Sequence, residues 1–552
     1  MNRAKNTIRK DKKEMKKTVK LLALCLALVM VFSLAACGTE PAAESDAPEV
    51  SGTPVASDSK YGGTITIRRS GTTVINPMQT SAVQIDKNVY GLFFESLLVT
   101  DENANVLPNL ATGYTVSEDG LTITMELVEN AVFFNGEPVN AEAVVATFNL
   151  YMDPEYQHIL IDYITGLESV EAVDEYTVQF NFSSPNSDFP AAMTTPIGYI
   201  MAPSAIESYK STGDNEVFAR EGGCGPFIMT EFIDGESIKT VRNENYYKTD
   251  AEGNQLPYLD GVTVQLVSDE SVMTQNMLSG DINSLDYFSG ITTLAQLQNA
   301  SNVTVKSLTC GYQYFLYMNM SKEPFDNELV REAMCYAVNF DEFNATFCSN
   351  EGLQSPTNIM SFQSFYKEFE NYTYNPEKAK ELLAEAGYPD GVEVELYYGT
   401  YGVMQQVCEM VQAQAKEAGF DIKLVGQDGA AIKSTWAVDN EDAPAGMRLQ
   451  NNGTPKVTAS ISMDYIFGDT ALQNCSKWHN SEFQTLLDSL TETFDADEQA
   501  AILGEMQELI YNDIPICTLF YAPNYTAYSN NLNGLYWDSD TACYYSEAWL
   551  SE

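Results

Sequence analysis

Histidine is almost absent from this chain of 552 residues, which has only His158 and His479, far apart in the sequence. Neither belongs to an HExxH segment, no GxSxG segment is present, and the two lack metal-ligand spacing. These absences argue against Ser-His-Asp hydrolysis and against histidine-based metal chemistry. A catalytic pair of carboxylates is not excluded by counting, because Asp and Glu occur throughout the chain and no pair stands out.

Basic residues are also scarce, with 30 Lys and Arg against 77 Asp and Glu. Nine of the basic and two of the acidic residues lie before Cys37, which leaves 21 basic and 75 acidic residues and a net charge of −54 after it. Nucleic acids and anionic lipids are bound by clustered Lys and Arg. We therefore exclude both as partners of the folded part, and we attribute its acidity to solvation of a secreted surface.

The cysteines form no CxxC pair, although eight of them follow Cys25 and Cys37. This pattern argues against a structural zinc site, and we predict neither a metal nor a cofactor. Disulfides are permitted outside the cytoplasm, but the sequence alone does not choose their pairing. Cys335 and Cys408 fall on the apolar faces of expected helices and are predicted to be buried thiols. The segment 495–497 starts like a calcium loop but lacks its glycine and closing Glu.

The N-terminus has the layout of a secretory signal, with basic residues up to Lys20 followed by an apolar run over residues 21–36. A spanning helix needs roughly 20 apolar residues, so a permanent span is the weaker interpretation. The run ends in Leu34-Ala35-Ala36-Cys37, which resembles the bacterial lipobox. We predict a lipoprotein signal peptide over residues 1–37 with Cys37 lipidated. A signal peptide with a chance cysteine, or an uncleaved anchor, is the alternative.

Residues 38–60 are rich in Gly, Pro, Ser, Ala and acidic side chains and offer little to bury, so we predict a disordered tether. Such a chain has a root-mean-square reach of roughly 25 to 30 Å, enough to hold a folded body beside a membrane. The folded part, residues 61–552, is too long for one hydrophobic core and predicts two or three domains.

Strand and helix patterns alternate through the folded part, which predicts an α/β class. The clearest helix is predicted for NPEKAKELLAEAG, where Asn375 can cap the start, Pro376 suits the first turn and Gly387 ends it. Two further helical stripes cover residues 329–337 and 483–490. Short runs rich in β-branched and aromatic residues predict strands, namely GGTITIRR, LTITMELV, YTVQFNF, GVTVQLV, FLYMNM, VEVELYY and PICTLFY.

Six segments in a fixed order resemble the family 5 solute-binding proteins of bacterial ABC importers, which include oligopeptide- and dipeptide-binding proteins. Each segment is weakly specific alone, but the order covers nearly all of the folded part. The segments are residues 89–149 with Phe134-Asn135-Gly136 and Ala141-Glu142-Ala143-Val144; GGCGPFIMTEFIDGESIKTVRNENYY; LSGDI at 278–282; MNMSKEPFDNELVREAMCYAVNFDEF; YNPEKAKELLAEAGYPDG; and NDIPICTLFY.

The resemblance implies a two-lobed periplasmic-binding-protein fold (type II, with an extra accessory domain), whose lobes are joined by crossing hinge strands. Carried onto this sequence, lobe I would comprise residues 61–95, 217–311 and 512–552, with an accessory domain at residues 96–216. Lobe II would be residues 312–511. The hinge would lie near residues 314–319 and 513–520. Solute would be shut between the lobes without any bond being broken.

Candidate ligand-binding residues follow from the rule that solute meets loops at the carboxyl ends of strands. After the first strand, the loop RRSGTTVIN offers Arg69 and Thr72. In lobe II, YYGTYG offers Tyr398 and Thr400, and Tyr314 lies at the crossing. Each of these could equally be an ordinary loop or surface residue.

The resemblance breaks at GMRLQNNGTPKVTAS. Peptide binders carry a Gly-Trp here and then an Asp that pairs with the peptide α-amine. With Arg448 at the start of this segment, Asn451 stands where Trp is expected and Thr454 where Asp is expected. The amine anchor is therefore missing. The solute is either a peptide held through its backbone by Asn451 and Asn452, or another solute, such as a glycoside or an anion drawn to Arg448. A structural salt bridge of Arg448 is the competing interpretation.

We predict a lipid-anchored, monomeric receptor on the extracytoplasmic face of the cell membrane, which captures peptides and delivers them to ABC permease subunits. The membrane is a partner only through the lipid anchor. A receptor of the same class for a carbohydrate or other small organic solute is the first alternative. A secreted hydrolase is the alternative from another class, and it would need a catalytic pair that the sequence does not display.

Overall fold

The computed structural model describes residues 60–70, 75–79, 83–363, 365–453, 459–469, 471 and 473–552. The predicted signal peptide, Cys37, the predicted tether up to residue 59, Thr72 and Thr454 lie outside these residues. The described residues belong to one compact unit. Within them, no helix has the length and apolar character needed to cross a membrane.

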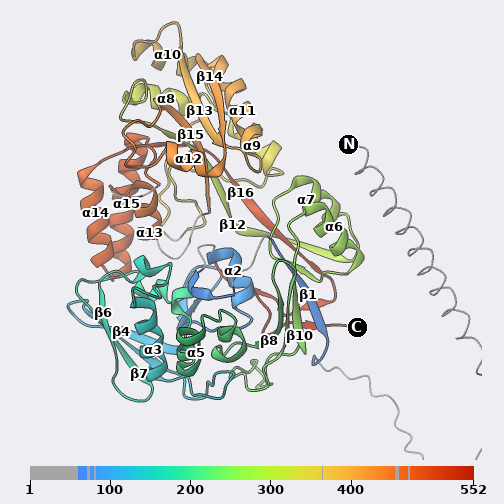
Figure 1. Cartoon of the computed structure of the whole chain (residues 1–552). Helices are drawn as coiled ribbons and strands as arrows, with labels where there is room; N and C mark the ends of the chain where they lie inside the picture. The colour runs from blue at the N-terminus through green and yellow to red at the C-terminus, as the bar shows by residue number, and fades with distance from the viewer. Residues whose placement is uncertain are drawn as a thin grey trace, which may run out of the picture. The chain divides into compact units, whose positions relative to one another are not determined.

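A ten-stranded mixed sheet organises the molecule, with two long strands, β12 and β16, near its middle (Figure 1). In spatial order the strands are β14 (Phe420–Gln427), β13 (Val392–Gly399), β15 (Gly446–Gly453), β12 (Val303–Met318), β16 (Ile516–Ser529), β11 (Ser284–Leu285), β1 (Thr64–Arg69), β10 (Gly261–Leu266), β9 (Ser237–Arg242) and β8 (Phe227–Ile233). We call β11, β1, β10, β9 and β8 the first half of the sheet, and β14, β13 and β15 the second half.

The first half of the sheet is parallel around β1 and antiparallel beyond it. β1 pairs in parallel with β10 and β11, and β10, β9 and β8 form an antiparallel meander. Parallel neighbours need long crossovers, which here contain the helices η1 (Pro77–Gln79), α2 (Val83–Tyr90), η4 (Phe218–Gly222) and α6 (Glu270–Ser279). A further helix, α7 (Ile291–Gln298), lies between β11 and β12.

The second half of the sheet is parallel, with β13 between β14 and β15. Its helices are α8 (Glu328–Tyr336), α9 (Phe340–Phe347), α10 (Pro376–Glu385), α11 (Met404–Glu417) and α12 (Gly429–Thr435). The predicted α10 is confirmed with its signals, since the Asn375 side chain accepts from the Lys378 amide and Gly387 has a positive φ of 98°. Cys335 and Cys408 are buried free thiols, as predicted.

β12 and β16 link the two halves as an antiparallel pair. β12 also pairs with β15 over its C-terminal part, so the same strand belongs to both halves. The β12–β16 register shifts between Leu308 and Gly311 and again between Tyr314 and Phe315. These irregularities lie where the two halves meet, and the second of them falls within residues 314–319, for which a hinge was predicted.

A separate four-stranded sheet, β4-β5-β7-β6, lies beside the first half (Figure 1). Asn140 caps its main helix, α3, by accepting from the Ala143 amide. We call this sheet and its helices the four-stranded domain. Its elements are β4 (Ala111–Val116), β5 (Thr122–Leu127), β6 (Leu167–Ala172), β7 (Thr177–Phe182), α3 (Ala141–Met152), η2 (Ile161–Ile164), α4 (Phe189–Ala192), η3 (Pro196–Gly198) and α5 (Pro203–Thr212).

Three helices between β15 and β16 form a group of their own, α13 (Ala459–Phe467), α14 (Ser481–Glu492) and α15 (Ala496–Asp513). Asp495 caps α15, because its carboxylate accepts from the amides of Asp497 and Glu498. The segment that starts like a calcium loop is therefore a helix start. Short strand pairs complete the described fold: β2 (Leu98–Thr100) with β3 (Val106–Pro108), β17 (Leu532–Asn533) with β20 (Trp549–Leu550), and β18 (Tyr536–Trp537) with β19 (Cys543–Tyr544).

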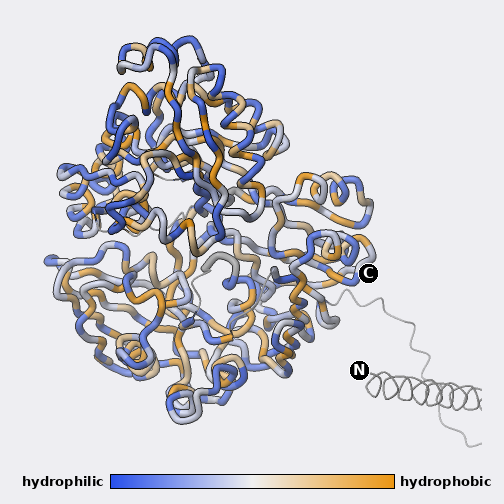
Figure 2. Tube along the Cα trace, turned by 45° about the horizontal axis from the view of Figure 1, so that its top comes forward, coloured by the Kyte–Doolittle hydropathy of each residue, from blue (hydrophilic) through white to orange (hydrophobic). Residues whose placement is uncertain are grey.

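Several hydrophobic cores stabilise these parts, as the length of the chain predicted. One core joins the four-stranded domain to β1, β8, β9 and β10, and two others flank the second half of the sheet on its two faces. Hydrophilic segments predominate at the periphery in Figure 2, and hydrophobic positions are concentrated along inner strands and helices. All seven predicted strands are present.

Candidate functional site

A row of polar side chains lies on one face of the second half of the sheet. Arg448, Gln450 and Asn452 alternate along β15, and alternate residues of a strand share a face. Arg448 is in register with Tyr317 of β12 and with Tyr397 of β13. Tyr317 and Tyr397 belong to the core beneath α13, α14 and α15. The row therefore faces these three helices.

Arg448 is the chemically distinctive member of this row, because it is a buried cation without a carboxylate partner among the described residues. Its side chain donates from Nη1 to the sulfur of Cys475 over 2.9 Å and from Nη2 to Oε1 of Gln450 over 2.6 Å. The residue is 4% exposed, and its buried Nε has no hydrogen-bond partner. A buried guanidinium is costly unless an anion compensates it. The structural salt bridge considered for Arg448 is not formed within the described part of the chain.

The surroundings of Arg448 include aromatic groups that sequence reasoning missed. Trp436 is fully buried and packs edge-on against Tyr397 at 5.8 Å, and its indole nitrogen lacks a hydrogen-bond partner in the described structure. Trp436, Arg448 and Cys475 come from three different segments, namely the end of α12, β15 and the connection before α14. Only the period of two along β15 could have placed Gln450 and Asn452 beside Arg448 in advance.

Tyr314 and Asn451 are brought together, since they are register partners in β12 and β15. The Tyr314 ring stacks on Phe520 of β16 with centroids 4.6 Å apart and an interplanar angle of 13°. Burial raises the pKa of Tyr314 to about 12. The phenol is therefore a neutral hydrogen-bonding group at the junction of the two halves.

Arg69 lies at the end of β1, as expected, but it is already paired. Its Nη2 contacts Oδ1 of Asp86 at 2.5 Å, and both side chains are almost completely buried. The neighbouring Arg68 pairs with Asp286 at 2.7 Å, and Asp286 also accepts from the Ser70 amide at 2.9 Å. Arg69 belongs to the first half of the sheet, whereas the β15 row belongs to the second.

Tyr398 and Thr400 are adjacent in sequence but occupy different environments. Tyr398 is 8% exposed and packs in the core on the face of the second half opposite to Arg448. Thr400 is exposed, and its amide donates to the Gln427 carbonyl at 2.8 Å. The alternation of β13 puts Tyr397, rather than Tyr398, on the face of Arg448.

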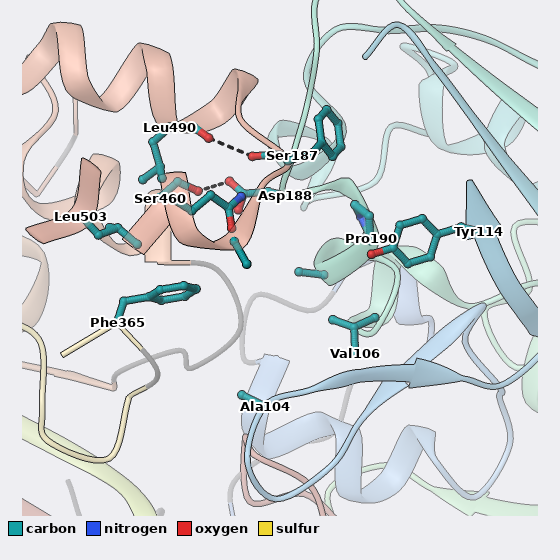
Figure 3. Close-up of a pocket in the computed structure, with 14 residues that line it drawn as sticks. Ala104, Val106, Tyr114, Ser187, Asp188, Pro190, Phe365, Ser460, Leu490 and Leu503 are labelled. Atoms are coloured by element: carbon teal, nitrogen blue, oxygen red, sulfur yellow. Dashed lines mark hydrogen bonds between the residues drawn. The ribbon is translucent and has the colours of Figure 1, made fainter. Parts of the chain in front are cut away.

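Two cavities lie between the four-stranded domain and the helices α13, α14 and α15, on either side of direct contacts. One has a volume of about 260 Å³, with Asp188 and Pro190 on one side and Ser460 and Leu503 on the other (Figure 3). The second, of about 320 Å³, is also lined by Asp188 and Ser460. Asp188 and Ser460 lie between the cavities and share a hydrogen bond. The described part of the chain holds no cluster of acidic, His or Cys ligands suited to a metal ion.

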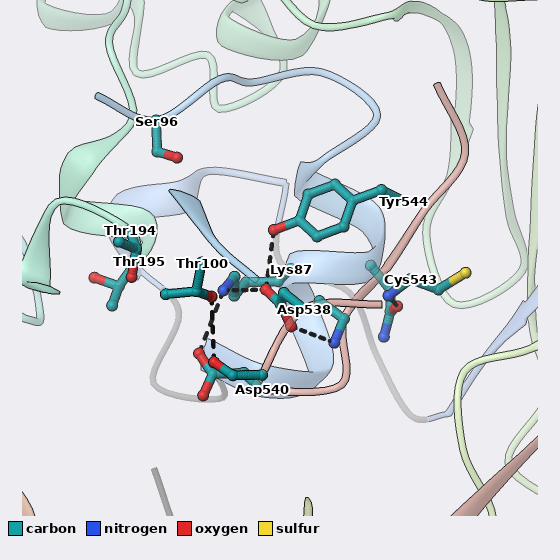
Figure 4. Close-up of polar contacts among 12 residues, drawn as sticks. Lys87, Ser96, Thr100, Thr194, Thr195, Asp538, Asp540, Cys543 and Tyr544 are labelled. Carbon is teal, nitrogen blue, oxygen red and sulfur yellow. Dashed lines mark hydrogen bonds and ion pairs between the residues drawn. The ribbon is translucent and has the colours of Figure 1, made fainter. Parts of the chain in front are cut away.

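A buried ionic cluster fixes α2 in the first half (Figure 4). Lys87 is 1% exposed, and its ammonium lies 2.6 Å from Asp538 and 3.3 Å from Asp540. Burial alone would lower the pKa of Lys87, but the two aspartates raise it well above its ordinary value. Tyr544 donates to Asp538 at 3.1 Å. The ammonium of Lys87 is engaged by both carboxylates, so the cluster holds the scaffold and offers no free cation to a solute.

Comparison with known proteins identifies a matching family and several similar proteins. Residues 105–474 match the family model described as bacterial extracellular solute-binding proteins, family 5 Middle. The glutathione-binding protein GsiB of Salmonella typhi is 26% identical over 467 residues, covering 83% of this chain and 88% of GsiB.

Solved structures show the same fold. One is the periplasmic binding protein DppA from Helicobacter pylori in complex with the peptide STSA, with a TM-score of 0.72 and 21% identity over 89% of this chain and 99% of DppA. Another is AgaA from A. tumefaciens R10 in complex with agropinic acid, with a TM-score of 0.71 and 21% identity over the same shares of the two chains.

Proposed function

Because the chain belongs to the family 5 bacterial extracellular solute-binding proteins, we propose that it is the lipid-anchored receptor of an ABC importer and that its solute is a peptide. Membership of this family makes the chain a transport receptor and not an enzyme, so the hydrolase alternative is set aside. The peptide assignment is supported by the glutathione-binding relative GsiB and by the fold shared with the STSA complex of DppA.

Capture in this proposal is a population shift. An open state admits solute, contacts with both lobes favour the closed state, and the closed shape docks on the permease. Lobe I comprises residues 61–95, 217–311 and 512–552, with an accessory domain at residues 96–216, and lobe II comprises residues 312–511. The irregular β12–β16 pairing at Gly311 supports a hinge at this boundary.

Arg448 is the proposed anchor for a solute carboxylate, and it is the observation on which the proposal chiefly rests. A buried guanidinium whose Nε lacks a partner can donate a charge-assisted hydrogen bond to an incoming anion. The carboxyl terminus of a peptide supplies such an anion. Gln450 and Asn452 flank the arginine on the same face, and Gln450 already orients one of its nitrogens.

The remaining predicted contacts have less direct support. Tyr314 and Asn451 would hydrogen-bond the peptide backbone at the junction of the lobes, and Thr400 would contribute from an exposed loop. Arg69 would act from lobe I only through the part of its guanidinium not engaged by Asp86. Because the sequence lacks the usual acidic amine anchor, we propose that recognition depends on the carboxylate more than on the α-amine.

Calorimetric titration with matched short peptides tests this proposal. We expect C-terminal amidation to weaken binding at least tenfold, because the anion for Arg448 is removed, and N-acetylation to change affinity by no more than about threefold. Arg448→Gln should abolish the preference for a free carboxylate, whereas Arg220→Gln, which alters an exposed arginine, should retain it. Equal binding of free and amidated peptides by the wild-type protein would contradict the carboxylate anchor.

A small organic acid is the second candidate solute, since the fold is shared with AgaA bound to agropinic acid and Arg448 suits any carboxylate. A carbohydrate lacks that charge and would leave Arg448 uncompensated. Mass spectrometry of solute released from the purified protein distinguishes these classes. A peptide supports the first proposal, and an organic acid or a sugar replaces it.

The lipid anchor is proposed from the sequence around Cys37. Wild-type protein should incorporate a fatty-acid label and remain with the membrane fraction, and Cys37→Ala should lose both properties. A Cys37→Ala protein that remained in the membrane fraction through an uncleaved segment would contradict this part of the proposal. We further propose that the receptor is a monomer, to be checked by light scattering.

A further inference from the structure

The four-stranded domain and the helices α13 and α14 meet along a polar seam, which we define by Ser187, Asp188, Ser460, Leu490 and Thr491. The Ser187 amide donates to the Thr491 carbonyl at 2.8 Å, and its hydroxyl donates to the Leu490 carbonyl at 2.9 Å. The Ser460 hydroxyl donates to Asp188 (Figure 3). These bonds join elements that are far apart in the sequence, so the seam is a tertiary contact and not a local connection.

Asp188 is the ionisable group at the centre of the seam. It precedes α4, yet its carboxylate makes no capping bond to that helix and points instead to Ser460. The residue is only partly exposed, and it lines both interdomain cavities. When the seam is closed, one neutral hydroxyl thus replaces much of the water around a carboxylate.

Among the described residues, the groups that line the cavities beside Asp188 carry no positive charge. From η2 come Asp162 and Tyr163, from α13 Asp464, and from α14 Asp488. No Lys, Arg or His lines either cavity among the described residues. Burial, together with Asp488 and Asp162, raises the pKa of Asp464. Closing the seam therefore brings carboxylates from both sides together, with no cation among the described residues that line the two cavities.

We propose that this seam is a proton-sensitive closure contact, in which protonation of Asp188 favours the closed arrangement of the receptor. The inference rests on the proposed closure of the lobes, but it concerns the solute-free equilibrium and not the identity of the solute. A neutral Asp188 loses less hydration on closure than a carboxylate does, and its hydrogen bond with Ser460 is retained.

The direction of the effect follows from linkage. Burial raises the pKa of Asp188 from its ordinary 3.8 to about 6 in the closed arrangement. The closed state therefore binds more protons than an open state with a solvated carboxylate, and closure becomes more favourable as pH falls through about 6. Between about pH 7.5 and pH 5, the ratio of closed to open molecules should rise up to about tenfold.

The test measures small-angle scattering of solute-free protein at about pH 7.5 and pH 5, together with hydrogen exchange of the peptide that contains Ser187. The wild-type protein should become more compact, and this peptide more protected, at the lower pH after correction for intrinsic exchange. Asp188→Asn mimics the neutral acid and should be compact and protected at both values. Asp234→Asn, an exposed aspartate in the β8–β9 turn, should behave like wild type.

A wild-type protein without pH dependence, or an Asp188→Asn protein that keeps the full dependence, overturns the inference. Circular dichroism confirms that each variant is folded before the comparison. The peptide titrations above compare different peptides on one protein at one pH, so a shift in closure changes all their affinities alike and leaves the comparison valid. Failure to bind peptides would thus overturn the proposed solute and leave the closure measurement intact.

Discussion

Gly311 of β12 lies so close to the backbone carbonyl of Ala522 in β16 that a Cβ at residue 311 would overlap the carbonyl oxygen. This approach occurs at the register shift in the pair of strands that joins the two halves of the sheet. The irregular pairing of the central strands thus depends on the absence of a side chain at one position.

The first prediction concerns this contact. Gly311→Ala should destabilise the protein by about 1–3 kcal/mol, because the two central strands must separate to admit the methyl group. Chemical denaturation followed by circular dichroism measures the change. Gly429→Ala is the control, because a Cβ there meets nothing and alanine suits the start of α12. If the two variants are equally stable, the strands are not constrained as described.

The second prediction concerns the ionic cluster of α2. Lys87→Met should cost about 3–5 kcal/mol, because it leaves Asp538 and Asp540 buried without their cation. Adding Asp538→Asn to this variant should restore part of the loss. Lys423→Met removes an exposed pair with Glu395 and should change the midpoint of urea unfolding very little. A small effect of Lys87→Met would show that the cluster relaxes or admits water.

The third prediction concerns pH. His158 is fully buried, its Nδ1 accepts from the Leu160 amide at 3.0 Å, and burial lowers its pKa from the ordinary 6.5 to about 3. Below pH 6.5 the His158 imidazole is therefore protonated in the unfolded state but stays neutral in the folded state. The contribution of His158 to the free energy of unfolding should therefore fall by roughly 1.4 kcal/mol per pH unit as the pH is lowered from about 6 to 3.5.

The contribution of His158 is measured as the difference in stability between the wild-type protein and its variants, because many carboxylates also titrate in that pH range. His158→Gln should be less stable near neutral pH yet lose stability less steeply on acidification. His479→Gln, which alters the exposed histidine beside Asp469, should follow the wild-type slope. Parallel curves for all three proteins would argue against a neutral, buried His158.

The fourth prediction concerns the start of α15. Asp495→Ala should destabilise the protein by about 1 kcal/mol, because two helix amides lose their acceptor. Calcium should not change the melting temperature of the wild-type protein through this segment. Glu505→Ala, at an exposed position within the same helix, is the control. A calcium-dependent stabilisation abolished by Asp495→Ala would restore the ion-binding interpretation.

The elements of this fold could be predicted where their signals are local. Asn375, Pro376 and Gly387 delimit α10 because capping and turn formation involve residues within a few positions of each other. The seven runs rich in β-branched and aromatic residues were predictable as strands because strand preference also depends on residues within a few positions of each other. Their order in the sheet is not local information, and the sequence did not predict it.

The candidate site was predictable only in part. Arg448 was singled out because it starts the segment at which the family resemblance breaks, but its neighbours Cys475, Tyr397 and Trp436 were not. Tyr398 was expected at the site, whereas the structure places it in a core on the other face of β13. A period of two separates the faces of a strand, yet it does not say which face will meet the ligand.

By itself the sequence determined the acidic composition, the α/β class, and the positions of α10 and of seven strands, because these depend on composition and on neighbours along the chain. The tertiary structure alone decided that Arg448 has no carboxylate beside it within the described residues and that Asp188 meets Ser460. Both depend on the packing of segments far apart in sequence, where burial rather than residue type sets the cost of a charge.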